Sequence, residues 1–118
     1  MQLPVINHPD YVAKINDDNK FPIKKFGALA DHLLKEKVVK KFFIPKECSI
    51  DTMKTSHSLE YINQIKNKTL DIKSQKKIGF PINDSVVRRS FVATGGTVLA
   101  SKLALDSKLA CNLSLIHI

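Results

Sequence analysis

The side chains that could bind a metal or move a proton are few in this sequence and lie far apart. They are four histidines, two adjacent aspartates and two cysteines: His8, His32, His57, His117, Asp17, Asp18, Cys48 and Cys111. A zinc site needs about three such ligands that converge on one point, and these residues are scattered along the chain. The cysteines lack CxxC spacing and the N-terminal residues show no secretory pattern, so we expect two reduced thiols. The spacing of these residues therefore predicts neither a catalytic constellation nor a metal site.

His57, in the segment TSHSLEYI, is open to two interpretations. Its ring could orient a neighbouring loop through a hydrogen bond, whereas a helix-capping or packing role is the more common use of such a side chain. Motifs for phosphate binding or acyl transfer are missing from the sequence. The glycines of TGGT, residues 94–97, lie inside a helical pattern rather than after a strand, and no GxSxG elbow occurs.

The chain is basic, with a formal net charge of +8 and a pI of about 9.6. Only Arg88 and Arg89 are arginines among its 19 positive side chains, whereas bidentate contacts to phosphates and guanine edges favour arginine. We therefore interpret the lysines as solvated surface and expect no nucleic-acid partner. A small basic module that binds nucleic acid or an acidic partner is the alternative function.

Length and composition indicate at most one globular domain. The 118 residues are 43% hydrophobic and 25% charged, which is typical of a folded protein rather than a disordered one. The longest uncharged apolar run is far shorter than the ~20 residues of a membrane-spanning helix. We expect a cytoplasmic protein with no membrane contact.

The elements that must position these residues follow from the hydrophobic pattern. Apolar residues at three- and four-residue steps predict a helix over residues 23–37, and short apolar runs predict buried strands over residues 3–7, 42–44 and 109–113. Ser49 caps a predicted short helix over residues 50–55, and Ser56 or Ser58 caps another that begins near Leu59. Residues 67–77 are polar and only weakly periodic, so we expect a loop with at most one helical turn.

The longest predicted helix covers residues 85–106, with Asp84 or Ser85 as its cap. It is apolar over more than half of its circumference, which predicts burial of a broad face. Gly95 and Gly96 in its middle cost about 1 kcal/mol each relative to alanine, and close approach of another backbone would explain them. A long helix followed by a buried strand is half of a βαβ unit, so we expect an α/β fold with a parallel sheet.

Five segments, taken in order, resemble successive landmarks of the histone deacetylase family, in its bacterial, class IV-like branch. They are NHPDY, FPIKKFGALADHLL, TSHSLEYI, IGFPINDSVVRRSFVATGGTVLASKLAL and LACNL. The resemblance spans residues 3 to about 113, and VVRRSFVATGGTVLASKLAL is its most specific part. It implies that residues 1–113 are the N-terminal portion of a histone deacetylase-like domain, an incomplete three-layer, parallel-sheet fold of the arginase/deacetylase type.

For the complete enzyme, the resemblance implies hydrolysis of acetyl-lysine or related small amides by a zinc ion bound to two aspartates and a histidine. In the family a strand like LACNL continues into Gly-Gly-x-His-His-Ala, which carries the acid/base histidines. Here the sequence instead reads Ser114-Leu115-Ile116-His117-Ile118. We therefore expect residues 114–118 to be a non-native tail, such as adapter read-through after a truncation, and we assign no catalytic role to His117.

The resemblance also implies that this fragment contains neither the metal ligands nor the catalytic residues. It would then bind no zinc and be inactive alone. One residue and one segment of the fragment have implied positions near the substrate. Lys24 corresponds to a basic residue beneath the catalytic pocket, and the connection before Asp84 corresponds to a segment near the substrate entrance.

Overall fold

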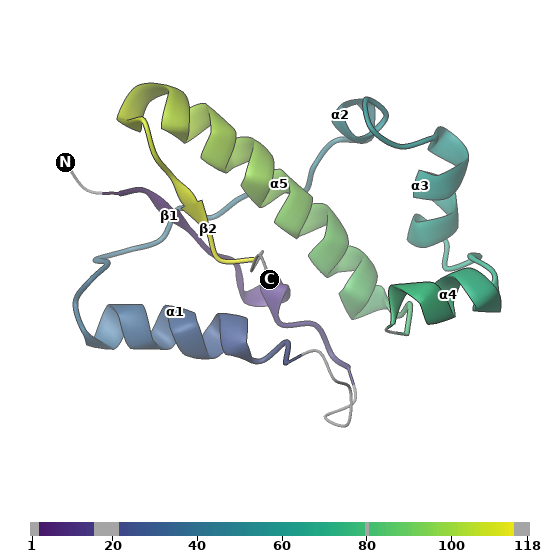
Figure 1. Ribbon diagram of the computed structural model, residues 1–118, viewed down its shortest axis with the longest axis horizontal. Coiled ribbons are helices and arrows are strands. Elements are labelled where there is room, and N and C mark those ends of the chain that lie inside the picture. The colour runs from purple at the N-terminus through teal and green to yellow at the C-terminus, as the bar shows by residue number, and fades with distance from the viewer. Residues whose placement is uncertain (1–2, 16–21, 80, 115–118) are drawn as a thin grey trace.

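A computed structural model describes residues 3–15, 22–79 and 81–114 (Figure 1). Helices predominate, and their longest member runs through the centre of the molecule. The elements in chain order are β1 (Val5–Ile6), the 3-10 helix η1 (Pro9–Tyr11), α1 (Lys25–Lys35), α2 (Ile50–Met53), α3 (Leu59–Lys66), α4 (Ile72–Ile78), α5 (Asp84–Ser107) and β2 (Cys111–Asn112).

The two strands pair in parallel, with Val5 opposite Cys111 and Ile6 opposite Asn112. The Cys111 amide donates to the Pro4 carbonyl at 2.9 Å, and the Leu113 amide donates to the Ile6 carbonyl at 3.0 Å. On the other side of β1, Phe43 forms an isolated parallel bridge with Ile6. β1 is therefore the central segment, with hydrogen bonds on both sides.

The predicted three-layer, parallel-sheet fold of the arginase/deacetylase type is wrong for the described part of the chain. That part is mostly helical, and its only sheet has two strands. The predicted strand over residues 42–44 reduces to a single bridge at Phe43. One physical reason is Pro45, which follows two residues later and has no amide hydrogen to donate to a ladder.

Helices cover the two faces of the strand pair. Val5 and Leu113 pack with Ala30 of α1, whereas Asn112 points to α5, where its amide nitrogen donates to the Ala93 carbonyl at 3.2 Å. This alternation follows from the two-residue period of a strand. A larger apolar cluster lies beyond the carboxyl ends of the strands, between η1, α1 and α5, and contains Tyr11, Ala13, Ile23, Phe26, Val86, Val92 and Ala93.

The glycine pair of α5 confirms the predicted close approach of another backbone. A Cβ atom at Gly95 would overlap the carbonyl oxygen of Lys46, and one at Gly96 would overlap the Tyr11 hydroxyl. The segment before α2 lies against the helix at this point, because the Cys48 amide donates to the Phe91 carbonyl at 2.9 Å. Glycine lowers the helix propensity at these two positions, but it allows the Lys46 carbonyl and the Tyr11 hydroxyl to approach the helix backbone closely.

Helix caps explain most of the remaining boundaries. Ser49 is confirmed as a cap, and of the two predicted alternatives Ser56 and Ser58 it is Ser58 that caps α3. Each hydroxyl accepts from a backbone amide in the first turn of its helix. Asn83, rather than the predicted Asp84 or Ser85, caps α5 and accepts from the Val86 amide at 2.9 Å. The helix α4 replaces most of the loop predicted over residues 67–77, and Asp71 caps it.

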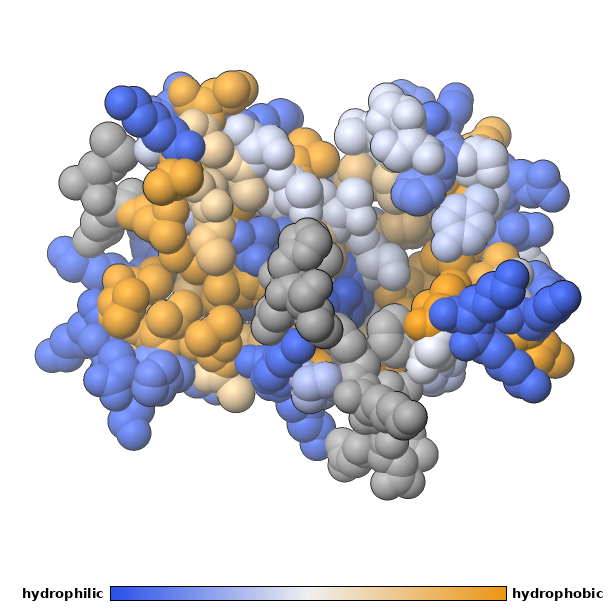
Figure 2. Space-filling view, viewed as in Figure 1, coloured by the Kyte–Doolittle hydropathy of each residue, from blue (hydrophilic) through white to orange (hydrophobic). Residues whose placement is uncertain are grey.

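Patches of apolar and of hydrophilic side chains can be distinguished on the visible surface (Figure 2). Apolar side chains gather over α1 and the strand pair, and hydrophilic side chains gather over α4, which exposes Lys73, Lys76 and Lys77. None of the helices in the part of the chain that the structure describes has the length and hydropathy needed to cross a membrane.

Candidate functional site

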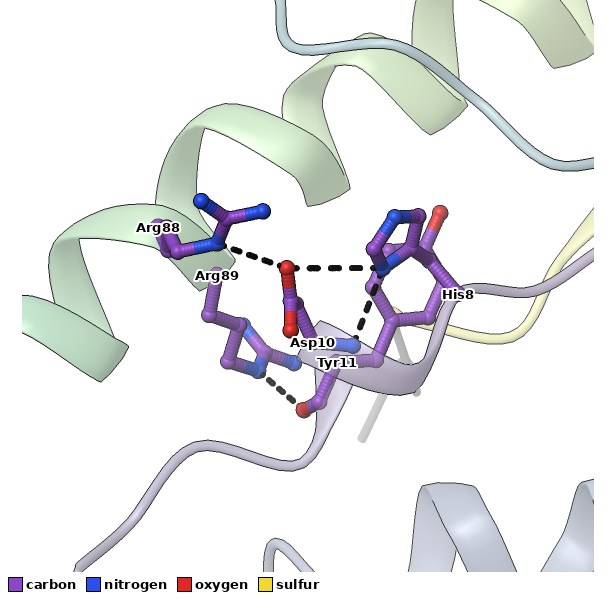
Figure 3. A network of polar contacts seen from close by, with 5 residues as sticks. All are labelled: His8, Asp10, Tyr11, Arg88 and Arg89. Atoms are coloured by element: carbon purple, nitrogen blue, oxygen red, sulfur yellow. Dashed lines mark hydrogen bonds and ion pairs between the residues drawn. The ribbon is translucent and has the colours of Figure 1, made fainter.

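The candidate site lies where the polypeptide leaves the carboxyl ends of β1 and β2. In sheets with parallel strands, ligands and catalytic groups collect at this edge. η1 follows β1 directly, and Leu113 and Ser114 follow β2. The first turns of α5 face both segments and supply Arg88 and Arg89, the two arginines of the chain (Figure 3).

An ion pair forms the outer part of the site. Arg88 Nε donates to Asp10 Oδ2 at 2.7 Å, and this contact raises the pKa of the exposed Arg88 guanidinium. His8 Nδ1 lies 3.7 Å from the same carboxylate oxygen and accepts from the Asp10 amide at 2.9 Å. Because Nδ1 is an acceptor, the neutral imidazole carries its proton on Nε2, which can donate to a further group.

Arg89 forms the inner part of the site and joins two segments that are distant in sequence. Its Nε donates to the Tyr11 carbonyl at 2.8 Å, and its Nη2 donates to the Ser114 carbonyl at 2.9 Å. The guanidinium carbon lies 5.0 Å from the centre of the Phe26 ring, a distance at which cation–π attraction contributes. Burial lowers the pKa of Arg89 from its usual value, and proximity to Tyr11 opposes that shift.

A buried tyrosine links η1 to β2. Tyr11 is 0% exposed, and its hydroxyl donates to Asn112 Oδ1 at 2.7 Å. Burial raises the pKa of Tyr11 to about 12, while Arg89 and the Asn112 hydrogen bond oppose the shift. The Asn112 amide nitrogen in turn donates to Ala93 and Thr97 of α5, so one hydrogen-bonded chain joins η1, β2 and the long helix.

Ser114, which follows β2, is buried, and only one of its polar groups has a hydrogen-bond partner among the described residues. The residue is 1% exposed, and its carbonyl accepts from Arg89. Its hydroxyl oxygen has no hydrogen-bond partner among the described residues. A buried hydroxyl without a partner is costly, so this position is suited to a further polar group.

The site holds backbone in place rather than presenting reactive groups. Its hydrogen bonds fix the segments after β1 and β2 relative to α5. In residues 3–15, 22–79 and 81–114, no three His, Cys, Asp or Glu side chains gather closely enough to hold a metal ion. The described residues therefore do not fit a zinc ion.

The structure places the other candidate residues away from this site. His32 is exposed on α1, His57 lies at the edge of a groove beside α3, and Asp84 forms an ion pair with Lys68. Lys24 is exposed at the start of α1, and its role beneath a catalytic pocket stays a prediction. Asp17, Asp18 and residues 115–118 of the predicted tail 114–118, with His117, lie outside the described residues.

Two features of the site were not predicted from the sequence. The His8-x-Asp10 spacing was a local signal that these side chains could meet, because η1 closes a single tight turn between them. The contacts of Arg89 join residues separated by 78 and 25 positions. Contacts between residues so far apart in the chain cannot be predicted from the local pattern of one sequence.

Comparison with known proteins found no matching family model. The chain is 37% identical over 114 residues to an uncharacterized protein of the cyanobacterium Picosynechococcus sp.. The alignment covers 95% of this chain and 38% of the relative. The chain thus spans well under half of the length of the protein that it resembles.

Proposed function

We propose that this chain is the N-terminal part of a zinc-dependent deacetylase that hydrolyses acetyl-lysine-type amides, and that it is inactive alone. The ordered series of segments that resemble landmarks of the histone deacetylase family supports the proposal. The existence of a relative much longer than the aligned segment also supports it, because residues outside the alignment could complete an active site.

The observation that carries the proposal is the anchoring of the backbone that leaves the end of β2. Leu113, directly after β2, donates its amide hydrogen to the Ile6 carbonyl at 3.0 Å. Arg89 donates to the backbone carbonyl at position 114, a group that any residue at this position would supply. In the family that the sequence resembles, the catalytic histidine pair follows a strand of this kind. A catalytic loop that starts here would begin at a fixed position. The backbone at position 114 is bonded to Arg89 of α5 and, through Arg89, to η1.

The contribution of this chain would be positional. Zinc, when bound in the complete enzyme, would supply the Lewis acid for amide hydrolysis, and its ligands would come from outside the described residues. The Tyr11–Asn112–Ala93 hydrogen bonds fix β2 against the helix. Sites held on strands and helices keep their geometry better than sites held on loops alone.

The direct test compares the 118-residue chain with the full-length cyanobacterial relative. For the chain, we expect no stoichiometric zinc by mass spectrometry and no hydrolysis of an acetyl-lysine peptide. For the relative, we expect bound zinc and deacetylation that a chelator abolishes and added zinc restores. A folded relative that binds no zinc and cleaves no acetyl-amide would refute the proposal, as would deacetylation by the short chain.

Genomic DNA gives an independent test. Sequencing of the source genome past codon 113 is expected to show an in-frame Gly-Gly-x-His-His continuation. A verified stop codon after Ile118 would contradict the proposal and favour the small basic binding module. That alternative further requires DNA affinity that falls steeply with added salt.

A further inference from the structure

A groove separate from the candidate site lies between the first half of α5 and the segment that contains α2, α3 and α4. Its volume is about 240 Å³. In Figure 1 these three short helices stand beside the N-terminal half of α5 and away from the strand pair. The groove therefore shares no element with the candidate site except α5.

The floor of the groove is apolar and well supported. Met53 and Ile62 are buried and belong to one hydrophobic cluster, against which Phe91 packs. Ile82 and Val86 line another part of the groove. An apolar cavity of about 150 Å³ can hold a benzene molecule, so the volume here fits one or two fused rings. The Phe91 ring and the Met53 sulfur are favourable neighbours for an aromatic ligand.

Two hydrogen-bonding side chains line the groove together. The rings of His57 and Tyr61 lie 5.6 Å apart, and both side chains are exposed. Neither ring forms a side-chain hydrogen bond with another described residue. The two hydroxyls on the opposite wall, those of Ser90 and Thr94, instead donate to carbonyls of their own helix. Polar groups available to a ligand are thus concentrated on the α3 side.

We propose that this groove binds a small aromatic monocarboxylate. The ring system lies on the floor formed by Met53, Ile62 and Phe91, and the carboxylate accepts hydrogen bonds from the His57 ring and the Tyr61 hydroxyl. An imidazole N–H and a phenol O–H are both donors that suit a carboxylate. The formal net charge of +8 favours an anionic ligand over a cationic one.

The probe is 2-naphthoate, titrated against the full 118-residue chain and followed by its fluorescence. We expect saturable one-to-one binding with a Kd of roughly 0.1–1 mM, as is usual for a ligand of this size. Thr94→Phe should abolish binding, because Thr94 lines the groove and the larger ring would fill it. Ser101→Phe is the matched control. Ser101 is also exposed on α5 and also bonds the carbonyl four residues earlier, but it does not line the groove.

A second pair of measurements tests the polar contacts without altering the floor. Tyr61→Phe and His57→Ala should each weaken 2-naphthoate about tenfold, as expected for loss of a hydrogen bond to a charged group. Binding of the neutral 2-naphthylmethanol should change less than twofold in the same variants. No saturable binding by the folded chain, equal binding by the Thr94→Phe and Ser101→Phe variants, or equal weakening of both ligands would each overturn the proposal.

Discussion

Replacement of Arg89 by alanine should destabilise the chain far more than the same change at its neighbour Arg88. Arg89 donates hydrogen bonds to two backbone carbonyls, at 2.8 and 2.9 Å, and so joins the segments that follow β1 and β2. Arg88 forms one exposed ion pair with Asp10. The two positions are adjacent on one helix, so helix propensity changes equally in both variants.

The magnitude follows from the contacts. Leaving a buried carbonyl without its donor costs about 1–3 kcal/mol, and loss of the cation–π contact with Phe26 adds about 0.5–1 kcal/mol. Water that enters the space left by the side chain would recover part of this loss. We therefore expect Arg89→Ala to lower the free energy of unfolding by about 3 kcal/mol. Arg88→Ala should lower it far less, because its ion pair with Asp10 is exposed and screened by solvent.

Urea unfolding followed by far-UV circular dichroism measures both changes, because most of the ordered structure is helical. Arg89→Lys is an informative third variant, since a lysine keeps the charge but cannot reach both carbonyls with a planar fork. It should recover less than half of the loss. If Arg89→Ala and Arg88→Ala unfold at the same urea concentration, the two carbonyl contacts do not stabilise the fold and the reasoning is wrong.

Three other predictions concern Tyr11, Gly96 and Cys48. Because the pKa of Tyr11 is raised from 10 to about 12 in the folded state, its stabilising contribution is complete below pH 10 and is lost between about pH 10 and 12, up to roughly 3 kcal/mol. In unfolding measured against pH, Tyr11→Phe should remove this decline and Tyr61→Phe should keep it. Gly96→Ala should lower the midpoint of thermal unfolding by more than 10 °C, or prevent folding, because its Cβ would overlap Tyr11 and Asn112. Gly79→Ala, at an open position with φ of +92°, should cost only about 1 kcal/mol. Burial raises the pKa of the Cys48 thiol, so Cys48 should react with a disulfide reagent more slowly in the folded chain than in urea; equal rates would contradict its burial.

The regions predicted best from the sequence are those where a local pattern decides the structure. The long helix was predicted within one residue at each end, because its apolar periodicity continues for six turns. Ser49 was predicted as a cap, and Ser58 as one of two candidates, for the same reason, since an N-cap depends on residues only three positions away. The close approach at the glycine pair followed from a broken propensity rule.

The predictions failed where distant contacts or competing signals decide the outcome. α4 was interpreted as a loop because its sequence IKSQKKI is lysine-rich, although Asp71 before it and Gly79 after it are helix-end signals. The fold class depended on a family resemblance and on short apolar runs, and only two of these runs form a ladder. The Arg89 contacts required the tertiary arrangement of η1, α5 and β2, which no window of the sequence contains.

The two central glycines of α5 also determine how the helix is turned about its own axis. Successive residues point about 100° apart around a helix, so Gly95 and Gly96 turn two different sides toward Lys46 and Tyr11. Rotation of α5 about its axis in either direction would replace a glycine at one of these contacts by a residue with a side chain. Arg89 precedes Gly96 by seven residues, which is close to two full turns, and therefore shares its side of the helix. The close packing at Gly96 thus fixes the rotation of α5 about its axis and directs the Arg89 guanidinium toward η1.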